Sequence, residues 1–223
     1  MAAAGNFNVY DITKECIGPL CYPEFDVMDK YLAQPDVLAS LNVKPGLAWQ
    51  SCSREVYADM LGDFLRSYAD RVTPLVDSGT RALIYVGTRD FICNWYGNER
   101  WVDALPWSGR YAFEDSDFVD WGVVGEAGET EEEGGGDISA PKPKPAPPRT
   151  RAGTVKGDGL PLTFALVEAA GHMVPMDQPA AALAMITAFT RGRNLSAGWA
   201  AGAGAGGVGA VAAAHPQARL GVA

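Results

Sequence analysis

The chain has 223 residues, of which 48% are hydrophobic and 20% are charged, and its formal net charge is −9. A protein that binds nucleic acid needs a basic face to displace counterions from phosphates, so this acidic balance argues against a nucleic-acid partner. No apolar run approaches the ~20 residues that cross a bilayer, and the first residues lack the basic and apolar regions of a signal peptide. The sequence therefore predicts a soluble chain with a hydrophobic core and no membrane contact.

Two segments have a composition that disfavours packing. Residues 124–152 and 194–223 are dominated by Gly, Ala, Pro and Glu, which bury too little apolar surface to offset the entropy lost on folding. We expect the first to be a disordered insert and the second a disordered tail, so that residues 1–123 and 153–193 form one interrupted domain. The tail begins with Asn194-Leu195-Ser196, a match to the N-glycosylation pattern for which chance is the simpler explanation.

Cysteine usage indicates an oxidising compartment. Cys16 and Cys21 flank a turn-forming Ile-Gly-Pro-Leu segment, and this spacing can close a short disulfide loop. A zinc site is the poorer interpretation, because zinc takes four ligands and the only two histidines lie far from both cysteines. Cys52 and Cys93 remain, each free or paired outside this chain.

Apolar residues at helical spacing predict two helices before the first strand. The first covers residues 25–41, with Pro35 disturbing its middle because proline has no backbone N–H to donate. The second begins after Ser53, a suitable N-cap, and runs toward Pro74. Later expected elements are a helix over 94–105, a β-hairpin with arms 118–124 and 153–156, and a closing helix over 178–191.

Two short apolar runs, residues 81–87 and 162–168, have the continuous hydrophobicity of strands buried in a parallel sheet. Each is followed by a loop with one candidate catalytic side chain, Asp90 in the first loop and His172 in the second. In open α/β sheets, the carboxyl ends of the strands face the crevice where reactive groups lie. The order of elements therefore predicts an α/β fold with Asp90 and His172 at one edge of its sheet.

Asp90 and His172 have the chemistry of a nucleophilic hydrolase. Taken singly, a turn aspartate and a structural histidine are the more common roles. Their order along the chain, however, is that of the last two members of the Ser-His-Asp triad in α/β-hydrolases, in which the nucleophile comes first. The histidine accepts the serine proton, and the carboxylate fixes the histidine tautomer and stabilises the imidazolium. No Gly-x-Ser-x-Gly nucleophile segment occurs in the 223 residues.

Longer motifs around both residues carry a family resemblance. Residues 87–95, Gly-Thr-Arg-Asp-Phe-Ile-Cys-Asn-Trp, and 171–179, Gly-His-Met-Val-Pro-Met-Asp-Gln-Pro, resemble the Asp and His signatures of serine carboxypeptidases of the carboxypeptidase Y type. Three further segments are similar to the same family: residues 8–12, the Cys16/Cys21 loop and residues 101–107. The resemblance spans about residues 6–193. It implies an α/β-hydrolase fold, of which this chain is the C-terminal portion of the sheet with flanking helices.

Carried over position by position, the resemblance makes Asp90 the triad acid and His172 the general base. It makes Cys93 a free thiol lining the substrate pocket, and it places Met173 at the border of the pocket for the leaving residue. Cys52 resembles a cysteine that the family pairs with one in its N-terminal half. The implied reaction removes C-terminal residues from peptides through an acyl-enzyme, with no cofactor and no metal. The implied location is the secretory pathway, the vacuole or lysosome, or the extracellular space.

The resemblance places the family's nucleophile and oxyanion-hole glycines upstream of these residues, so we expect a truncated carboxypeptidase that is inactive alone. One alternative is a fragment of a serine carboxypeptidase-like acyltransferase, which uses the same triad. Another is a non-catalytic subunit or pseudoenzyme that works with the missing N-terminal half or a partner chain. A third makes Cys93 the nucleophile and His172 its base. It is disfavoured because Cys93 would compete with Asp90 for one imidazole.

Overall fold

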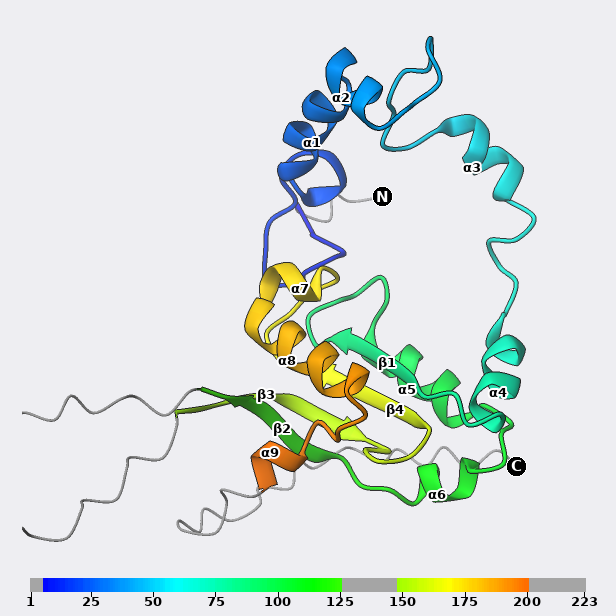
Figure 1. Ribbon diagram of the computed structural model, residues 1–223, viewed down its shortest axis with the longest axis vertical. Coiled ribbons are helices and arrows are strands. Elements are labelled where there is room, and N and C mark those ends of the chain that lie inside the picture. The colour runs from blue at the N-terminus through cyan, green and yellow to red at the C-terminus, as the bar shows by residue number, and fades with distance from the viewer. Residues whose placement is uncertain (1–5, 126–147, 201–223) are drawn as a thin grey trace, which may run out of the picture.

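The computed structural model describes residues 6–125 and 148–200. Its centre is a four-stranded sheet with the strand order β1-β4-β3-β2 (Figure 1). β1 (Ala82–Gly87) and β4 (Leu162–Val167) are parallel. β3 (Arg149–Lys156) runs antiparallel both to β4 and to β2 (Val119–Val124). The two expected parallel strands are therefore confirmed, and they pair in register along their whole length.

The apolar side chains of β4 divide between the two faces of the sheet. Leu162, Phe164 and Leu166 belong to one core cluster, with side chains from α4 (Ala69–Asp77), α5 (Trp95–Asp103) and α6 (Arg110–Glu114). Ala165 and Val167 belong to the other, with side chains from α7 (Val174–Asp177) and α8 (Pro179–Thr190). Side chains alternate along a strand, and here both faces are covered by helices, which is why this strand is apolar throughout. The fold thus consists of three layers, with the sheet between two layers of helices, and β4 contributes to the core on both faces.

The helices flank this sheet or lie in the segment that precedes it. Their bounds are η1 (Pro19–Cys21), α1 (Glu24–Leu32), α2 (Pro35–Ser40), α3 (Arg54–Met60), α4 (Ala69–Asp77), α5 (Trp95–Asp103), α6 (Arg110–Glu114), α7 (Val174–Asp177), α8 (Pro179–Thr190) and α9 (Ala197–Ala200). The expected helices over 94–105 and 178–191 correspond to α5 and α8. None of the helices in the described ranges is long and apolar enough to cross a membrane.

Two helix predictions were wrong in extent. The helix expected over 25–41 is divided into α1 and α2, because Pro35 occupies the first turn of a new helix rather than the middle of an old one. The helix expected from Ser53 to Pro74 ends at Met60, and α4 begins only at Ala69. An amphipathic helix depends on packing of its apolar face. Leu65, in the gap, is 96% exposed, so that packing is missing here.

The hairpin is confirmed, but its second arm is longer than expected, since β3 begins at Arg149. Most of the expected insert, 124–152, and of the expected tail, 194–223, lies outside the described residues. The structure nevertheless continues past the closing helix. Leu195 is buried, and the backbone N–H groups of Leu195 and Ser196 donate to the Asp158 carboxylate at 2.9 and 2.8 Å. Sequence reasoning did not anticipate this anchored segment or α9.

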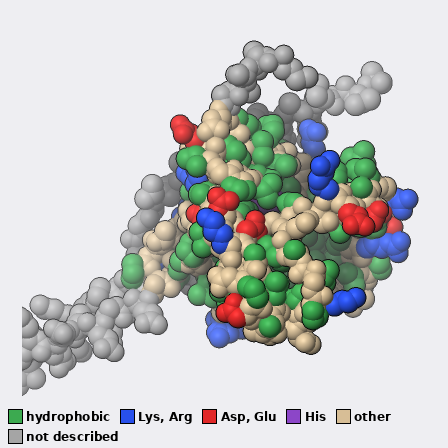
Figure 2. Space-filling view, turned by 90° about the horizontal axis from the view of Figure 1, so that it is seen from above, with side chains coloured by type: hydrophobic (Ala, Val, Ile, Leu, Met, Phe, Trp, Pro, Cys, Tyr) green, Lys and Arg blue, Asp and Glu red, His purple; other side chains and the backbone are tan. Residues whose placement is uncertain are grey.

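The segment from the start of α1 to the start of α4 forms an arm that leaves the sheet and returns to it (Figure 1). Many apolar side chains of the arm are exposed. Figure 2, in which the molecule of Figure 1 is viewed from above, shows hydrophobic side chains over much of the visible face. The exposed members include Val27, Tyr31, Leu41, Leu47, Val56, Tyr57, Met60, Leu61, Phe64 and Leu65. Within the described part of the chain, β1 also lacks a strand partner on the side opposite β4. An apolar arm and an open parallel edge are both features that proteins normally cover.

Candidate active site

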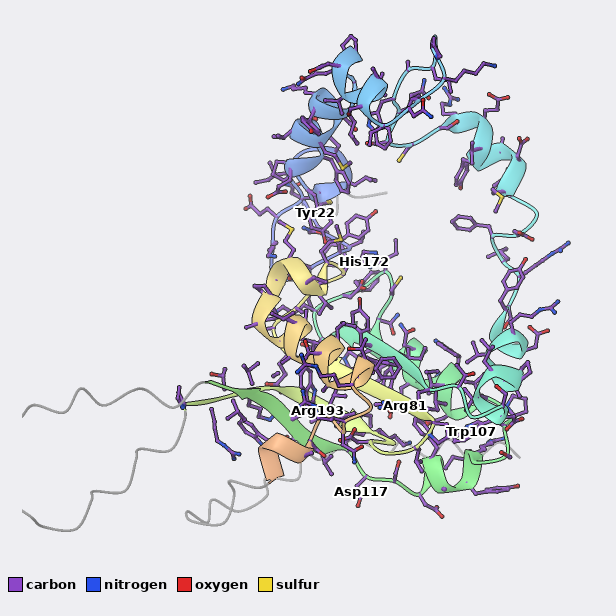
Figure 3. The ribbon with its side chains drawn as sticks, viewed as in Figure 1. Tyr22, Arg81, Trp107, Asp117, His172 and Arg193 are labelled. Carbon is purple, nitrogen blue, oxygen red and sulfur yellow. A yellow bond between two sulfur atoms is a disulfide. The ribbon has the colours of Figure 1, made fainter. Side chains whose placement is uncertain are left out.

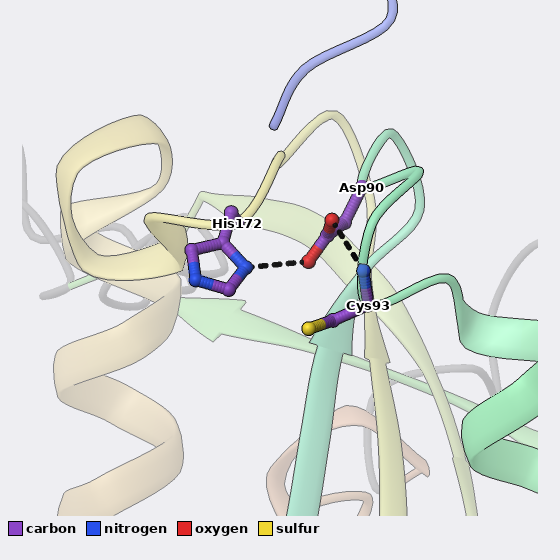
Figure 4. Close-up of side chains that lie close together, drawn as sticks. All are labelled: Asp90, Cys93 and His172. Atoms are coloured by element: carbon purple, nitrogen blue, oxygen red, sulfur yellow. Dashed lines mark hydrogen bonds and ion pairs between the residues drawn. The ribbon is translucent and has the colours of Figure 1, made fainter. Parts of the chain in front are cut away.

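The loops after β1 and β4 meet at the carboxyl edge of the sheet and hydrogen-bond to each other. The N–H of Thr88 donates to the carbonyl of Val167 at 3.0 Å, and that of Arg89 donates to Ala170 at 2.9 Å. These bonds continue the parallel ladder beyond the strands. As a result Asp90 and His172 lie side by side, with 2.9 Å between Asp90 Oδ2 and His172 Nδ1 (Figure 4).

Two glycines permit close backbone approaches around the pair. A Cβ on Gly87 would lie 2.3 Å from the carbonyl oxygen of Ala170, and a Cβ on Gly171 would lie 2.3 Å from that of Tyr10. Real Cβ atoms do not come so close to backbone, so only glycine fits at either position without a shift of a loop. Both glycines belong to the motifs that carried the family resemblance.

Both oxygens of Asp90 are engaged. Oδ2 pairs with His172, and Oδ1 accepts the backbone N–H of Cys93 at 3.0 Å. The Asp90 side chain is only 3% exposed, whereas that of His172 is 39% exposed. An ionised carboxylate only accepts hydrogen bonds, so this contact favours the imidazole tautomer with the proton on Nδ1 and the lone pair on Nε2. Figure 4 shows that second nitrogen directed away from Asp90, where a reacting group can reach it.

Cys93 lies beside the pair as a free cysteine. Burial of the thiol, and then the charge of Asp90, raise the pKa of Cys93 above its ordinary value. The thiolate is the nucleophilic form, so this site disfavours Cys93 as a nucleophile. Ligand atoms of Asp90, Cys93 and His172 lie within 4.8 Å of one another, as a metal site would need. The carboxylate oxygens and Nδ1 are already committed to hydrogen bonds, however, and we interpret the group as an acid–base pair with a neighbouring thiol.

The pair opens onto a hollow of about 180 Å³. Its lining residues come from β1, α5, the N-terminus of α7 and the two loops: Tyr85, Val86, Gly87, Asp90, Cys93, Asn98, His172 and Val174. Sequence reasoning missed Tyr85 and Asn98. Asn98 lies on α5 and donates to the carbonyl of Cys93 at 2.9 Å, a contact between the helix and the loop before it that no motif in the sequence indicates.

The structure does not place the other candidates at this hollow. Met173 is partly buried at the N-terminus of α7 and is not among the lining residues, so its role at the leaving-residue pocket stays a prediction. Cys52 is free and exposed beside α3, and its pairing with an upstream cysteine also stays a prediction. The expected disulfide between Cys16 and Cys21 is confirmed.

Comparison with known proteins identifies the family. A family model described as serine carboxypeptidase matches residues 2–192. A serine carboxypeptidase-like protein of Pisum sativum is 43% identical over 192 residues, which are 86% of this chain and 58% of the relative. Serine carboxypeptidase 3 of Oryza sativa subsp. japonica is 38% identical over 193 residues, 86% of this chain and 33% of the relative. The chain thus spans between a third and three-fifths of these two relatives.

A solved structure has the same fold. The crystal structure of Kex1(delta)p, a prohormone-processing carboxypeptidase from Saccharomyces cerevisiae, superposes with a TM-score of 0.62 at 24% sequence identity. The match covers 85% of this chain and 38% of that one. It establishes the α/β-hydrolase fold for the described sheet and its helices. Because the family model matches most of the chain, we conclude that the chain belongs to the serine carboxypeptidase family.

Proposed function

We propose that Asp90 and His172 are the acid and the general base of a serine-type carboxypeptidase. The observation that carries this proposal is the contact of 2.9 Å between Asp90 Oδ2 and His172 Nδ1, made by a buried carboxylate and an accessible imidazole. This is the arrangement that holds a histidine in the tautomer able to accept a proton at Nε2. Family membership supplies the reaction class in which such a pair works.

In the proposed reaction, Nε2 of His172 accepts the proton of a serine hydroxyl while the serine oxygen attacks the carbonyl carbon of the last peptide bond. Asp90 stabilises the imidazolium that forms. His172 then gives the proton to the nitrogen of the departing C-terminal residue, which leaves an acyl-enzyme. Water, activated by the same histidine, releases the shortened peptide. The proposed substrate is therefore a peptide with a free C-terminus, and no step requires a cofactor or a metal.

The serine would come from polypeptide outside these 223 residues, since they contain no Gly-x-Ser-x-Gly segment. The open edge of β1 and the exposed apolar arm are consistent with a polypeptide that continues the sheet beside β1. The 223-residue chain would then be inactive without that polypeptide. The Cys16–Cys21 disulfide favours folding in the secretory pathway, because such bonds form and persist in oxidising compartments.

The test is a chimera in which residues 6–193 replace the matched part of rice serine carboxypeptidase 3. We expect the chimera to release the C-terminal residue of an N-blocked dipeptide, and a His172→Gln chimera to lose that activity. The unmodified rice protein is the positive control, and the 223-residue chain alone should be inactive. Release that persists in the His172→Gln chimera would contradict the proposed role of His172.

A further inference from the structure

A loop near the N-terminus lies against both catalytic loops. We call residues 6–16 the N-terminal strap. Its ends are joined by a β-bridge between Phe7 and Glu15 and by a hydrogen bond from the Cys16 N–H to the Asn6 carbonyl at 3.1 Å. Inside the strap, the buried Asn8 Oδ1 accepts the backbone N–H of Tyr10 at 2.9 Å and that of Asp11 at 3.2 Å. The strap is therefore a closed loop with a defined shape.

The strap hydrogen-bonds to the chain on both sides of Asp90. The carbonyl of Val9 accepts the N–H groups of Phe91 at 3.2 Å and of Ile92 at 3.0 Å. On the other side, the N–H of Ile12 donates to the carbonyl of Arg89 at 3.0 Å. Three backbone bonds thus fix the loop that carries the triad acid.

The same strap also holds the His172 loop. The carbonyl of Tyr10 accepts the backbone N–H of His172 at 2.8 Å. The centroid of the Tyr10 ring lies 5.4 Å from that of the His172 imidazole. On its other side the Tyr10 ring lies 5.6 Å from that of Tyr22, which Figure 3 shows close to His172 at the base of the arm. Tyr10 therefore supports both the backbone and the ring of the general base.

An ionic link completes the attachment. Lys14 lies 3.2 Å from the Asp11 carboxylate and forms an ion pair and hydrogen bond with Asp177. The other oxygen of Asp177 accepts the backbone N–H of Gly171, directly before His172, at 2.8 Å. The Asp11 and Asp177 side chains are 2% and 8% exposed. The hydrogen bond to Asp177 raises the pKa of Lys14, which keeps the ammonium charged between these two carboxylates.

We propose that the N-terminal strap sets the relative orientation of Asp90 and His172, with Lys14 as a positioning residue that acts through Asp177 and Gly171. Lys14 touches neither member of the pair. Without its charge, two buried carboxylates lose their shared counterion, and Asp177 is no longer held where it accepts the Gly171 N–H. The His172 loop is then free to turn its ring away from Asp90. The proposal rests on the proposed function only in treating the pair as catalytic, because its geometry is measurable without turnover.

The test uses the whole chain and the nitrogen resonances of its two histidines. Long-range 1H–15N correlations from the carbon-bound ring protons report the tautomer of each imidazole, and a His215→Gln variant assigns those of His172. In the unmodified chain we expect the Nδ1–H tautomer to predominate, because Asp90 accepts that proton. In Lys14→Met we expect the Nε2–H tautomer, which unrestrained imidazole prefers, to become the major form. Lys14→Arg, which keeps the positive charge, should give the spectrum of the unmodified chain. Lys30→Met, at an exposed lysine on α1, should give the same spectrum.

A second variant distinguishes loss of the Lys14–Asp177 ion pair from general unfolding. Asp177→Asn keeps an oxygen that can accept the Gly171 N–H but removes the ion pair with Lys14, and we expect the same change of tautomer. Backbone amide signals of β4 should stay in place in both variants. An unchanged His172 tautomer in Lys14→Met or Asp177→Asn would overturn the proposal, as would a predominant Nε2–H tautomer in the unmodified chain. An inactive chimera with the expected tautomers would instead count against the proposed function alone.

Discussion

Asp90 accepts a hydrogen bond of 2.9 Å from His172 Nδ1, although the two residues are 82 positions apart in the sequence. In an Asp90→Asn chimera with rice serine carboxypeptidase 3, an amide replaces the carboxylate. It can donate to Nδ1 and so favours the tautomer that lacks a base at Nε2. We expect kcat for dipeptide hydrolysis to fall by about 10⁴-fold with little change in KM. Steady-state kinetics measure this, with Asp26→Asn at an exposed position of α1 as the control. A fall of less than about tenfold would contradict a triad role for Asp90.

Gly171 lies against the strap backbone, and this contact predicts the effect of adding a methyl group. In Gly171→Ala, the new Cβ would lie 2.3 Å from the carbonyl oxygen of Tyr10, so the strap or the His172 loop has to move. Forced overpacking of this kind destabilises by about 1–3 kcal/mol. Urea unfolding of the chain should show the loss as a lower midpoint with an unchanged slope.

The matched control for this substitution is Gly62→Ala. A Cβ on Gly62 meets nothing within 4 Å, and its backbone is not in the left-handed region. We expect its unfolding midpoint to stay close to that of the parent chain or to rise slightly, since alanine lowers the entropy of the unfolded chain. If both alanine variants have the same midpoint, the close approach at Gly171 is not a constraint on this protein.

The position of the Asp90–His172 pair could be predicted from the sequence because it depends on local signals. Each apolar run is short enough to be a strand, and each is followed by the loop that carries Asp90 or His172. Parallel pairing of β1 with β4 then brings the two loops to one edge of the sheet. The motif around each residue also contains a glycine, Gly87 or Gly171, whose small size the loop contact requires.

The features that sequence reasoning missed depend on contacts between distant segments. Apolar spacing predicted one long helix after Ser53, but spacing does not reveal whether an apolar face has something to pack against. In the structure Leu65 has no such partner, and the helix ends before it. Likewise, residues 8–12 were recognised as similar to the family without a reason for their presence. Their backbone hydrogen bonds to the loops that carry Asp90 and His172 supply that reason only once the fold is known.

The lowered pKa of Asp11 predicts how the stability of the folded chain depends on pH. Burial raises the pKa of Asp11, but hydrogen bonds from the hydroxyl and N–H of Thr13, together with Lys14, outweigh burial, so the pKa lies below its ordinary 3.8. A carboxyl group with a lowered pKa stabilises the folded state above the unfolded-state pKa, and this contribution disappears as the pH falls through the folded-state pKa. We therefore expect the contribution of Asp11 to be constant above about pH 5 and to decline below about pH 4.

Urea midpoints of the chain between about pH 3 and pH 7 test this dependence. Asp11→Asn should lower the midpoint near neutral pH and flatten part of its decline toward acid, because the substituted side chain no longer titrates. Asp26→Asn, on the exposed surface of α1, should change neither. Parallel curves for the parent chain and Asp11→Asn would show that the charge of Asp11 does not contribute to stability.

The rate at which the Cys93 thiol is alkylated should depend on the charge of Asp90, and it can be measured without a peptide substrate. Burial and the charge of Asp90 both raise the pKa of this thiol, so little of it is ionised near neutral pH and alkylation by iodoacetamide should be slow. In a Cys52→Ser background Cys93 is the remaining free cysteine among the described residues, and its rate can be followed by mass spectrometry. Asp90→Asn removes the second cause of the shift but not burial, so we expect faster alkylation at neutral pH and a pH profile displaced to lower values. If the carboxylate and the thiol were not close together, the two profiles would coincide, because only proximity lets the charge of Asp90 act on Cys93.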